Sequence, residues 1–156
     1  MGLGSKNNLE KLNVTSCKFT FKGAQALFSV LGRNYKLREL IIDKNSLDGK
    51  RLRVIRETLM TNNSLVTLSM NQCSLGEDGA FYIAHGVVKN KKLKHLYLAG
   101  NDFGDDGFSN FSDVISNYNF GVETLDLSNN SFTDKGAIIF SKGLTLNTSL
   151  LTLLLR

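Results

Sequence analysis

The residues of this chain best suited to catalysis or metal binding are two histidines and two cysteines. A zinc site or a catalytic triad needs several such groups at defined spacings. The sequence contains no Cys-x-x-Cys, His-Glu-x-x-His or Gly-x-Ser-x-Gly pattern. His85 falls in a segment with helical periodicity and His95 in one with strand periodicity, and nothing places either beside a nucleophile. We therefore predict no enzyme activity, no cofactor and no metal site.

The elements that position these residues repeat with a period of 28 residues. Six segments of the form Leu-x-x-Leu-x-Leu open at Leu9, Leu37, Leu65, Leu93, Val122 and Leu150. The one departure is a spacing of 29 residues between Leu93 and Val122. Repeats of this length indicate stacked supersecondary units that share a continuous core.

Each repeat is predicted to hold a short strand followed by a helix. Apolar residues three and five positions after the opening, such as Leu40 and Ile42, alternate with other residues, which is typical of a strand with one buried face. Later in each repeat the period becomes that of an amphipathic helix, as over residues 80–87. Because a helix follows every strand, we expect parallel strands in one sheet.

Three columns of small or polar residues accompany this pattern. Eight positions after the opening stand Cys17, Asn45, Cys73, Asn101 and Asn130. We expect these asparagines to hydrogen-bond the backbone where it bends inward. Three positions before each next opening stand Asn34, Asn62, Asn90, Asn119 and Asn147, a column that predicts left-handed helix C-caps. The column of Gly23, Gly79, Gly107 and Gly136 predicts a tight turn or a close backbone approach where each helix begins.

With these columns the chain resembles a leucine-rich repeat protein of the ribonuclease-inhibitor-type subfamily over residues 9–156. The resemblance implies an α/β fold, a right-handed solenoid shaped as a curved horseshoe segment. The parallel sheet would lie on the concave face and the helices on the convex face. The subfamily includes enzyme inhibitors, GTPase activators, innate immune sensors and actin regulators, so the resemblance implies protein binding. Arg51 departs from the pattern because glycine is expected at its position, and Gly49 stands two positions earlier.

We expect residues 1–8 to be a tail or a cloning remnant and residues 9–156 to form one repeat domain. The repeats are expected at 9–36, 37–64, 65–92, 93–121 and 122–149, with a partial repeat at 150–156. Because neither end carries a polar capping repeat, we expect a fragment of a longer array. The alternative is end-to-end self-association through the uncapped termini. No apolar run has the length of a transmembrane helix.

Cysteine usage predicts a cytoplasmic protein. Cys17 and Cys73 lie two repeats apart. Strands that are two apart in a sheet are about 10 Å from each other. A disulfide requires Cα atoms within about 7 Å, so we expect two free, buried thiols, as in a reducing compartment.

Charge is unevenly distributed along the chain. Residues 1–94 carry a net charge of +9 and residues 95–156 a net charge of −4. Acidic residues near helix starts and lysines near helix ends account for part of this pattern. The cluster Lys50, Arg51, Arg53 and Arg56 is not explained in that way. We disfavour nucleic acid as its ligand because no aromatic residues are interleaved with it.

The strand residues that point away from the core are predicted to form the binding surface. The partner-binding residues predicted there are Glu39, Ile41, Asp43, Ser69, Asn71, His95, Tyr97, Asp126 and Ser128. Tyr97 is the predicted anchor because binding hot spots favour aromatic side chains. One side chain of a partner would fit between Tyr97 and Ile41, over Ser69, and the three acids would pair with a basic partner. The alternative is that Tyr97 only packs over Ile41 and small neighbours, as cross-strand pairs do.

Three functions are compatible with the sequence. The first is a non-catalytic module that binds a protein partner on the concave face, with no small-molecule substrate. The second is a GTPase-activating or other regulatory domain, for which Arg51 is the candidate residue. The third is a structural or sensor segment of a larger scaffold or immune receptor, with contacts on its helices.

Overall fold

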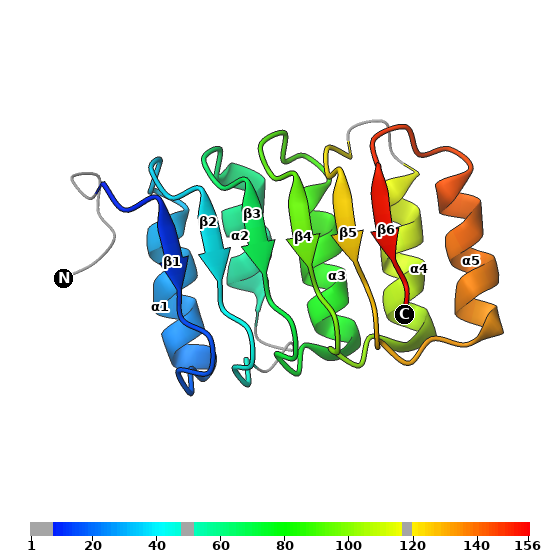
Figure 1. The fold of residues 1–156 in the computed structure, drawn as a ribbon, viewed down its shortest axis with the longest axis horizontal. Helices are drawn as coiled ribbons and strands as arrows, with labels where there is room; N and C mark the ends of the chain where they lie inside the picture. Colours follow the sequence, from blue (N-terminus) through cyan, green and yellow to red (C-terminus); the bar gives the residue numbers. More distant parts are fainter. Residues whose placement is uncertain (1–7, 48–51, 117–119) are drawn as a thin grey trace.

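The computed structural model describes residues 8–47, 52–116 and 120–156. Strand and helix alternate along the chain (Figure 1). The strands are β1 (Lys11–Asn13), β2 (Glu39–Ile41), β3 (Thr67–Ser69), β4 (His95–Tyr97), β5 (Thr124–Asp126) and β6 (Thr152–Leu154). The helices are α1 (Phe21–Leu31), α2 (Arg53–Thr61), α3 (Gly76–Val87), α4 (Gly104–Ile115) and α5 (Asp134–Leu144). This order confirms the predicted strand–helix repeat.

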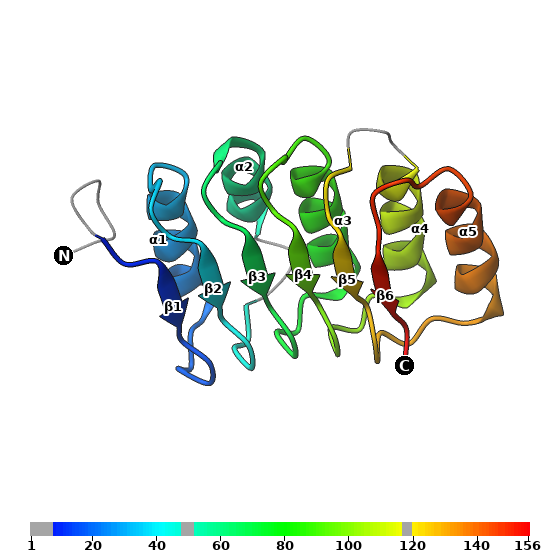
Figure 2. The same cartoon turned by 45° about the horizontal axis from the view of Figure 1, so that its top comes forward.

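The strands form one parallel, six-stranded sheet in the order β1-β2-β3-β4-β5-β6. Leu12, Leu40, Leu68, Leu96 and Leu125 are paired in register across β1 to β5 and so stack in a single file. The helices cover one face of the sheet and leave the other face open (Figures 1 and 2). Neighbouring strands are about 4.8 Å apart and packed helices about 8–10 Å apart. This difference curves the stack with the sheet on its inner side, as predicted for a horseshoe segment.

The core lies between the sheet and the helices and runs through all the repeats. Leu40, Leu68, Leu96 and Leu125 are fully buried, as are the helix residues Phe28, Ile55 and Ile83 that face them. No repeat closes this core alone, because each helix packs against the helix of the next repeat. At the two ends of the stack, Leu9 and Leu151 remain exposed.

The asparagines at the carboxyl ends of the strands act as predicted. Asn101 donates from Nδ2 to the carbonyl oxygens of Leu98 in its own repeat and Met70 in the preceding one, at 2.9 and 2.8 Å. Its Oδ1 accepts the backbone N–H of Cys73 at 2.8 Å. Asn45 and Asn130 bond the preceding repeat in the same way. We call this column the lower asparagine ladder, after its place in Figure 1.

The second asparagine column differs from its prediction. None of Asn34, Asn62, Asn90 and Asn147 has a positive φ, so they do not form left-handed C-caps. Asn62 instead donates from Nδ2 to the carbonyl oxygen of Leu31 in the preceding repeat at 2.7 Å. Its Oδ1 accepts the backbone N–H of Leu65 at 2.8 Å. We call this column the upper asparagine ladder. It ties consecutive repeats together at the amino ends of the strands, as the lower asparagine ladder does at their carboxyl ends. Asn119 lies outside the described residues.

The left-handed turns occur elsewhere, directly after the strands. The residue seven positions after each opening has a positive φ in all five repeats: Ser16, Lys44, Gln72, Gly100 and Asn129. Gly76 and Gly104, at the first positions of α3 and α4, also have a positive φ of 59°. Of the predicted glycine column, Gly107 and Gly136 are sites of close approach, since a Cβ there would overlap Phe103 and Asp105, whereas a Cβ at Gly23 would make only ordinary contacts.

One carboxylate caps the helix of the neighbouring repeat. Asp105, in the first turn of α4, accepts the backbone N–H groups of Thr133 and Gly136 at 2.8 and 3.0 Å. Thr133 also donates its hydroxyl to Asp105 at 2.8 Å. These donors lie at the start of α5, where a negative charge is favourable. The hydrogen bonds from the Thr133 backbone and hydroxyl lower the pKa of Asp105 below its ordinary value of 3.8.

Candidate functional site

The open face of the sheet, which we call the sheet face, carries the predicted binding residues in rows that run across the strands. The middle row consists of Asn13, Ile41, Ser69, Tyr97, Asp126 and Leu154, each in register with the next. Ile41, Tyr97 and Asp126 are half-buried, and Ser69 is buried. The structure thus brings the predicted anchor and its neighbours into one line.

Ser69 forms a low point between two large side chains in this row. Its register partners are Ile41 on β2 and Tyr97 on β4. Ile41 and Tyr97 are two strands apart, or about 10 Å. Both side chains keep exposed surface over the strands, and no aromatic stacking partner is found for Tyr97 among the described residues. The arrangement offers an apolar seat, two side chains wide, on a largely polar surface.

A hydrogen-bonded cluster lies below this seat, at the carboxyl ends of β2 to β4. The carboxylate of Asp43 accepts from the hydroxyl of Ser69 at 2.7 Å and from the backbone N–H and side-chain amide of Asn71 at 2.9 and 3.1 Å. Asn71 Oδ1 in turn accepts the backbone N–H of Ala99 at 2.7 Å. Asp43 therefore bridges two strands, which makes its carboxylate less available to a partner than the sequence suggests.

The other predicted charged residues of the sheet face differ in how strongly they are engaged. Glu39 forms an ion pair with Lys11 at 3.1 Å, and His95 Nδ1 lies 3.1 Å from the hydroxyl of Thr124. Asp126 accepts one hydrogen bond, from the backbone N–H of Ser128 at 2.9 Å. Within the described residues, Asp126 is thus the acid of the sheet face that forms neither an ion pair nor a bridge between strands, and it lies beside Tyr97.

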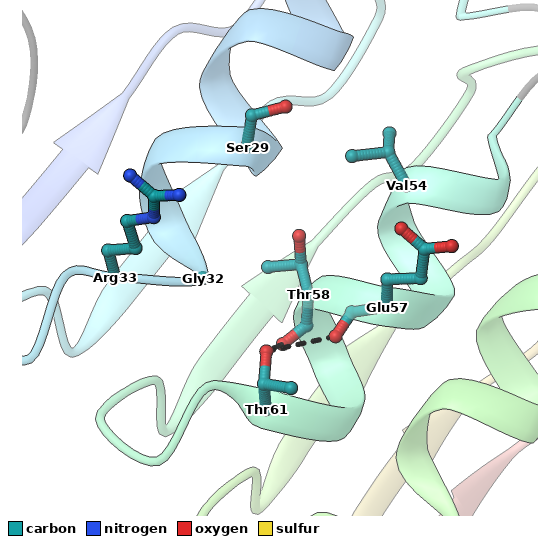
Figure 3. A pocket seen from close by; sticks show the side chains of 7 residues that line it. All are labelled: Ser29, Gly32, Arg33, Val54, Glu57, Thr58 and Thr61. Atoms are coloured by element: carbon teal, nitrogen blue, oxygen red, sulfur yellow. Dashed lines mark hydrogen bonds between the residues drawn. The ribbon is translucent and has the colours of Figure 1, made fainter.

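A separate hollow lies on the helical side of the molecule, between α1 and α2 (Figure 3). This groove of about 410 Å³ is lined by Ser29, Gly32, Arg33, Val54, Glu57, Thr58 and Thr61. Thr58 donates its hydroxyl across the gap to the carbonyl oxygen of Phe28 at 2.8 Å, which joins the two helices at one level. The groove is not evident from the sequence, because neither helix is unusual when taken alone.

The remaining candidates for chemistry are dispersed. Cys17 and Cys73 are free thiols, as the strand spacing predicts, although Cys17 is exposed and not buried. Burial raises the pKa of the Cys73 thiol to about 11. His85 lies on α3, where its ring packs on Phe81 with 4.4 Å between ring centres. Arg51, Lys50 and Gly49 lie outside the described residues, so the structure does not test the proposed regulatory arginine.

Among residues 8–47, 52–116 and 120–156, no group of three or more His, Cys, Asp or Glu side chains is arranged to hold a metal ion. Over the same residues, no helix is long and apolar enough to span a membrane.

Comparison with known proteins places these features in context. A family model described as leucine-rich repeat matches residues 5–28, 61–84, 89–112 and 118–140, together more than half of the chain. Human "NACHT, LRR and PYD domains-containing protein 14" is 30% identical over 143 residues, which is 91% of this chain and 13% of that protein. Human "NACHT, LRR and PYD domains-containing protein 5" is 31% identical over 120 residues, or 76% of this chain and 10% of that protein. The chain thus spans only about a tenth of the length of these relatives.

Solved structures share the fold at low sequence identity. The C-terminal domain of tropomodulin from Caenorhabditis elegans superposes with a TM-score of 0.73 at 12% identity, over 91% of this chain and 86% of that one. A structure titled "Leiomodin-1 Actin-Binding Site 2" superposes with a TM-score of 0.70 at 13% identity, over 90% of this chain and 83% of that one. Neither the family model nor these relatives and structures indicate a catalytic family.

Proposed function

Because the chain belongs to the leucine-rich repeat family, we propose that it is a non-catalytic module that binds a protein partner on its sheet face. The observation that carries this proposal is the seat formed by Ile41, Ser69 and Tyr97 on three adjacent strands. Binding hot spots are enriched in tyrosine and cluster near the centre of an interface. Asp126, adjacent to Tyr97, favours a partner segment that carries a cation next to the apolar side chain in the seat.

The proposal is compatible with the size of the surface. A standard protein interface uses about 20–30 residues on each side, and six strands with three outward positions each approach that number. We also propose that residues 9–156 divide into the expected repeats and that the chain belongs to the ribonuclease-inhibitor-type subfamily. We also propose a cytoplasmic location, which is supported by the two free thiols.

The test is affinity capture from a lysate with the double variant Ile41→Ala/Tyr97→Ala, followed by quantitative mass spectrometry. We expect the specific partner to be lost, since removal of a central aromatic anchor costs about 2 kcal/mol or more in binding free energy. Phe81→Ala is the matched control, because Phe81 is an exposed aromatic residue on α3, on the opposite side of the molecule. Equal capture by the double variant and the unchanged protein would refute the choice of face.

The similarity to NACHT, LRR and PYD domains-containing proteins favours a second candidate function. In this alternative the chain is a sensor or scaffold segment of a longer protein and makes its contacts through its helices. The same experiment separates the two functions. The second candidate predicts that Phe81→Ala reduces capture while the sheet-face variant does not.

A further inference from the structure

The connections that lead from each helix to the next strand form one rim of the solenoid, at the top of Figure 1. We call it the upper rim and define it by residues 32–38, 62–66, 88–94, 120–123 and 145–151. These segments contain seven lysines and arginines and one acid, Glu123. Acids gather instead at the opposite rim, in the first turns of α3 and α4. The charge asymmetry therefore runs from rim to rim as well as along the chain.

The seven cations form two matching sets. Arg33, Lys36 and Arg38 follow α1, and Lys89, Lys92 and Lys94 occupy the equivalent positions after α3, with Lys91 as the additional residue. Between the two sets, the equivalent positions are Thr61 at the end of α2 and Ser64 and Val66 in the connection that follows, and all three are uncharged. The same three positions thus carry cations after α1 and after α3 but not after α2.

Within each set, one cation has a structural role and two remain exposed. Arg38 donates to the carbonyl oxygen of Ser64 at 3.2 Å, and Lys94 donates to that of Gly121 at 3.1 Å, in both cases on the next connection of the rim. Lys94 also pairs with Glu123 at 3.0 Å. The other members, Arg33 and Lys36 in the first set and Lys89 and Lys92 in the second, are exposed. No ion pair is found for these four within the described part of the chain.

The two exposed pairs stand on a backbone that the upper asparagine ladder holds in place. The backbone N–H of Lys36 donates to Asn34 Oδ1 at 2.8 Å, and that of Lys92 donates to Asn90 Oδ1 at 2.9 Å. The helix dipole does not account for Lys36 or Lys92, because its effect is confined to the last helical turn and each lies five residues beyond its helix.

From this geometry we propose that the upper rim is a second interaction surface, which binds an acidic, extended segment of a protein partner. The two cation pairs are two repeats apart, about 10 Å at the level of the strands and about 16–20 Å at the level of the helices that Arg33 and Lys89 follow. An extended chain advances about 3.3 Å per residue, so a run of four to six acidic residues spans both pairs. Tyr35, 51% exposed beside Lys36, adds one aromatic contact at the end of the rim.

The rim suits an acidic peptide better than it suits nucleic acid or a membrane. A single-strand binder combines a continuous basic groove with a series of stacking aromatic residues, whereas here an uncharged connection separates the two pairs. Interfacial binding to a membrane requires a broad apolar face. The exposed apolar residues in or near this rim, Tyr35, Met60, Leu146 and Leu151, belong to four different repeats, and the two leucines lie at the C-terminal end, away from the two cation sets.

The test measures the binding of a fluorescein-labelled deca-glutamate peptide by fluorescence anisotropy, at 50 and 200 mM salt. The rim variant is Arg33→Glu/Lys36→Glu/Lys89→Glu/Lys92→Glu. Its matched control, Lys18→Glu/Lys22→Glu/Lys44→Glu/Lys135→Glu, changes the net charge equally at exposed positions away from the upper rim. We expect at least a tenfold loss of affinity in the rim variant and less than a threefold loss in the control. Circular dichroism verifies that both variants are folded.

A gain-of-function variant keeps the test decisive if the quadruple variant is unstable. Thr61→Lys places a cation at the equivalent position of the uncharged connection and should strengthen deca-glutamate binding about threefold.

Equal losses in the rim variant and its control would overturn the proposal. Tighter binding of a 20-nucleotide single-stranded DNA or of phosphatidylserine vesicles through the same four residues would also overturn it. Ile41→Ala/Tyr97→Ala should leave peptide binding unchanged, so the result is independent of the sheet-face proposal.

Discussion

The first and the last helix pairs of this solenoid are built on the same repeat, yet they meet differently. Between α4 and α5, Gly143 packs directly on Ser112, whose hydroxyl donates to the carbonyl oxygen of Ile139 at 2.8 Å. Between α1 and α2, Thr58 occupies the position equivalent to Gly143 and donates to Phe28, and the groove of Figure 3 lies beside it. The sheet register is continuous through both pairs. A smaller groove, of about 240 Å³ against about 410 Å³, lies between α4 and α5, so the larger side chain in this helix column accompanies the wider groove.

The largest expected effect is at the aromatic cluster of the α4–α5 pair. Phe108 is fully buried, and its ring lies 4.1 Å from that of Phe132 and 5.4 Å from that of Phe140 between ring centres. We expect Phe108→Ala to lower the free energy of unfolding by about 3–5 kcal/mol, because it leaves a cavity in the core. Urea unfolding measures the change, with Phe81→Ala as the exposed control. A loss no greater than that of the control would contradict the described packing.

Two glycine-to-alanine substitutions, one at each helix junction, compare the junctions directly. A Cβ at Gly143 would overlap the carbonyl oxygen of Ser112, so Gly143→Ala should destabilise the protein by about 1–3 kcal/mol. A Cβ at Gly32, in the groove, has its nearest neighbour at 3.7 Å. Gly32→Ala should therefore be neutral or stabilise by up to about 1 kcal/mol, since alanine reduces the entropy of the unfolded chain. Opposite signs in thermal unfolding support the comparison, and equal losses reject it.

The cap that joins α4 to α5 should depend on pH. The pKa of Asp105 is lower in the folded protein than its ordinary value of 3.8, so its stabilising effect is present above that value and is lost as the pH falls through the folded pKa. Asp105→Asn should lower the melting temperature at pH 7, and the difference from the unchanged protein should narrow below about pH 4. Asp106→Asn, one residue along α4, is the control. A difference that is constant with pH would exclude the carboxylate as the cause.

The smallest expected effect concerns thiol chemistry and not stability. Cys17 is exposed in the first repeat, whereas Cys73 is buried and its pKa is raised to about 11, which keeps it protonated at neutral pH. We expect Ellman's reagent to detect one thiol in the folded protein and two after unfolding in urea. Rapid modification of Cys73 in the folded state would show that the lower asparagine ladder opens readily.

The sequence predicts the solenoid well because its signals are periodic. The strand leucines, the helix stripes and the lower asparagines recur at fixed spacing, and each has one physical reason for its position. The left-handed turns are not evident from the sequence, because Lys44 and Gln72 have a positive φ but no residue type that indicates one. The predicted role of the upper asparagines as left-handed caps is wrong. A helix C-cap and a hydrogen bond between repeats both favour asparagine at this position, so the residue type does not distinguish the two roles.

The details of the sheet face are harder to predict. Alternation places Ile41, Ser69 and Tyr97 on the outward side, and the register then brings them together. The engagement of Asp43 depends on partners 26 and 28 residues away and on the orientation of a hydroxyl and an amide. Sequence spacing determines which residues are neighbours, but it does not determine which acceptors their hydrogen bonds reach.

The two asparagine ladders have a consequence for how such an array can change. From the second repeat on, each described ladder asparagine donates to a carbonyl group of the preceding unit and also accepts a backbone N–H group. A unit that keeps the upper asparagine, an asparagine or cysteine in the lower column and its length of 28 or 29 can therefore be duplicated, deleted or transplanted as a cassette. The surfaces that contact other molecules are then free to diverge from one cassette to the next.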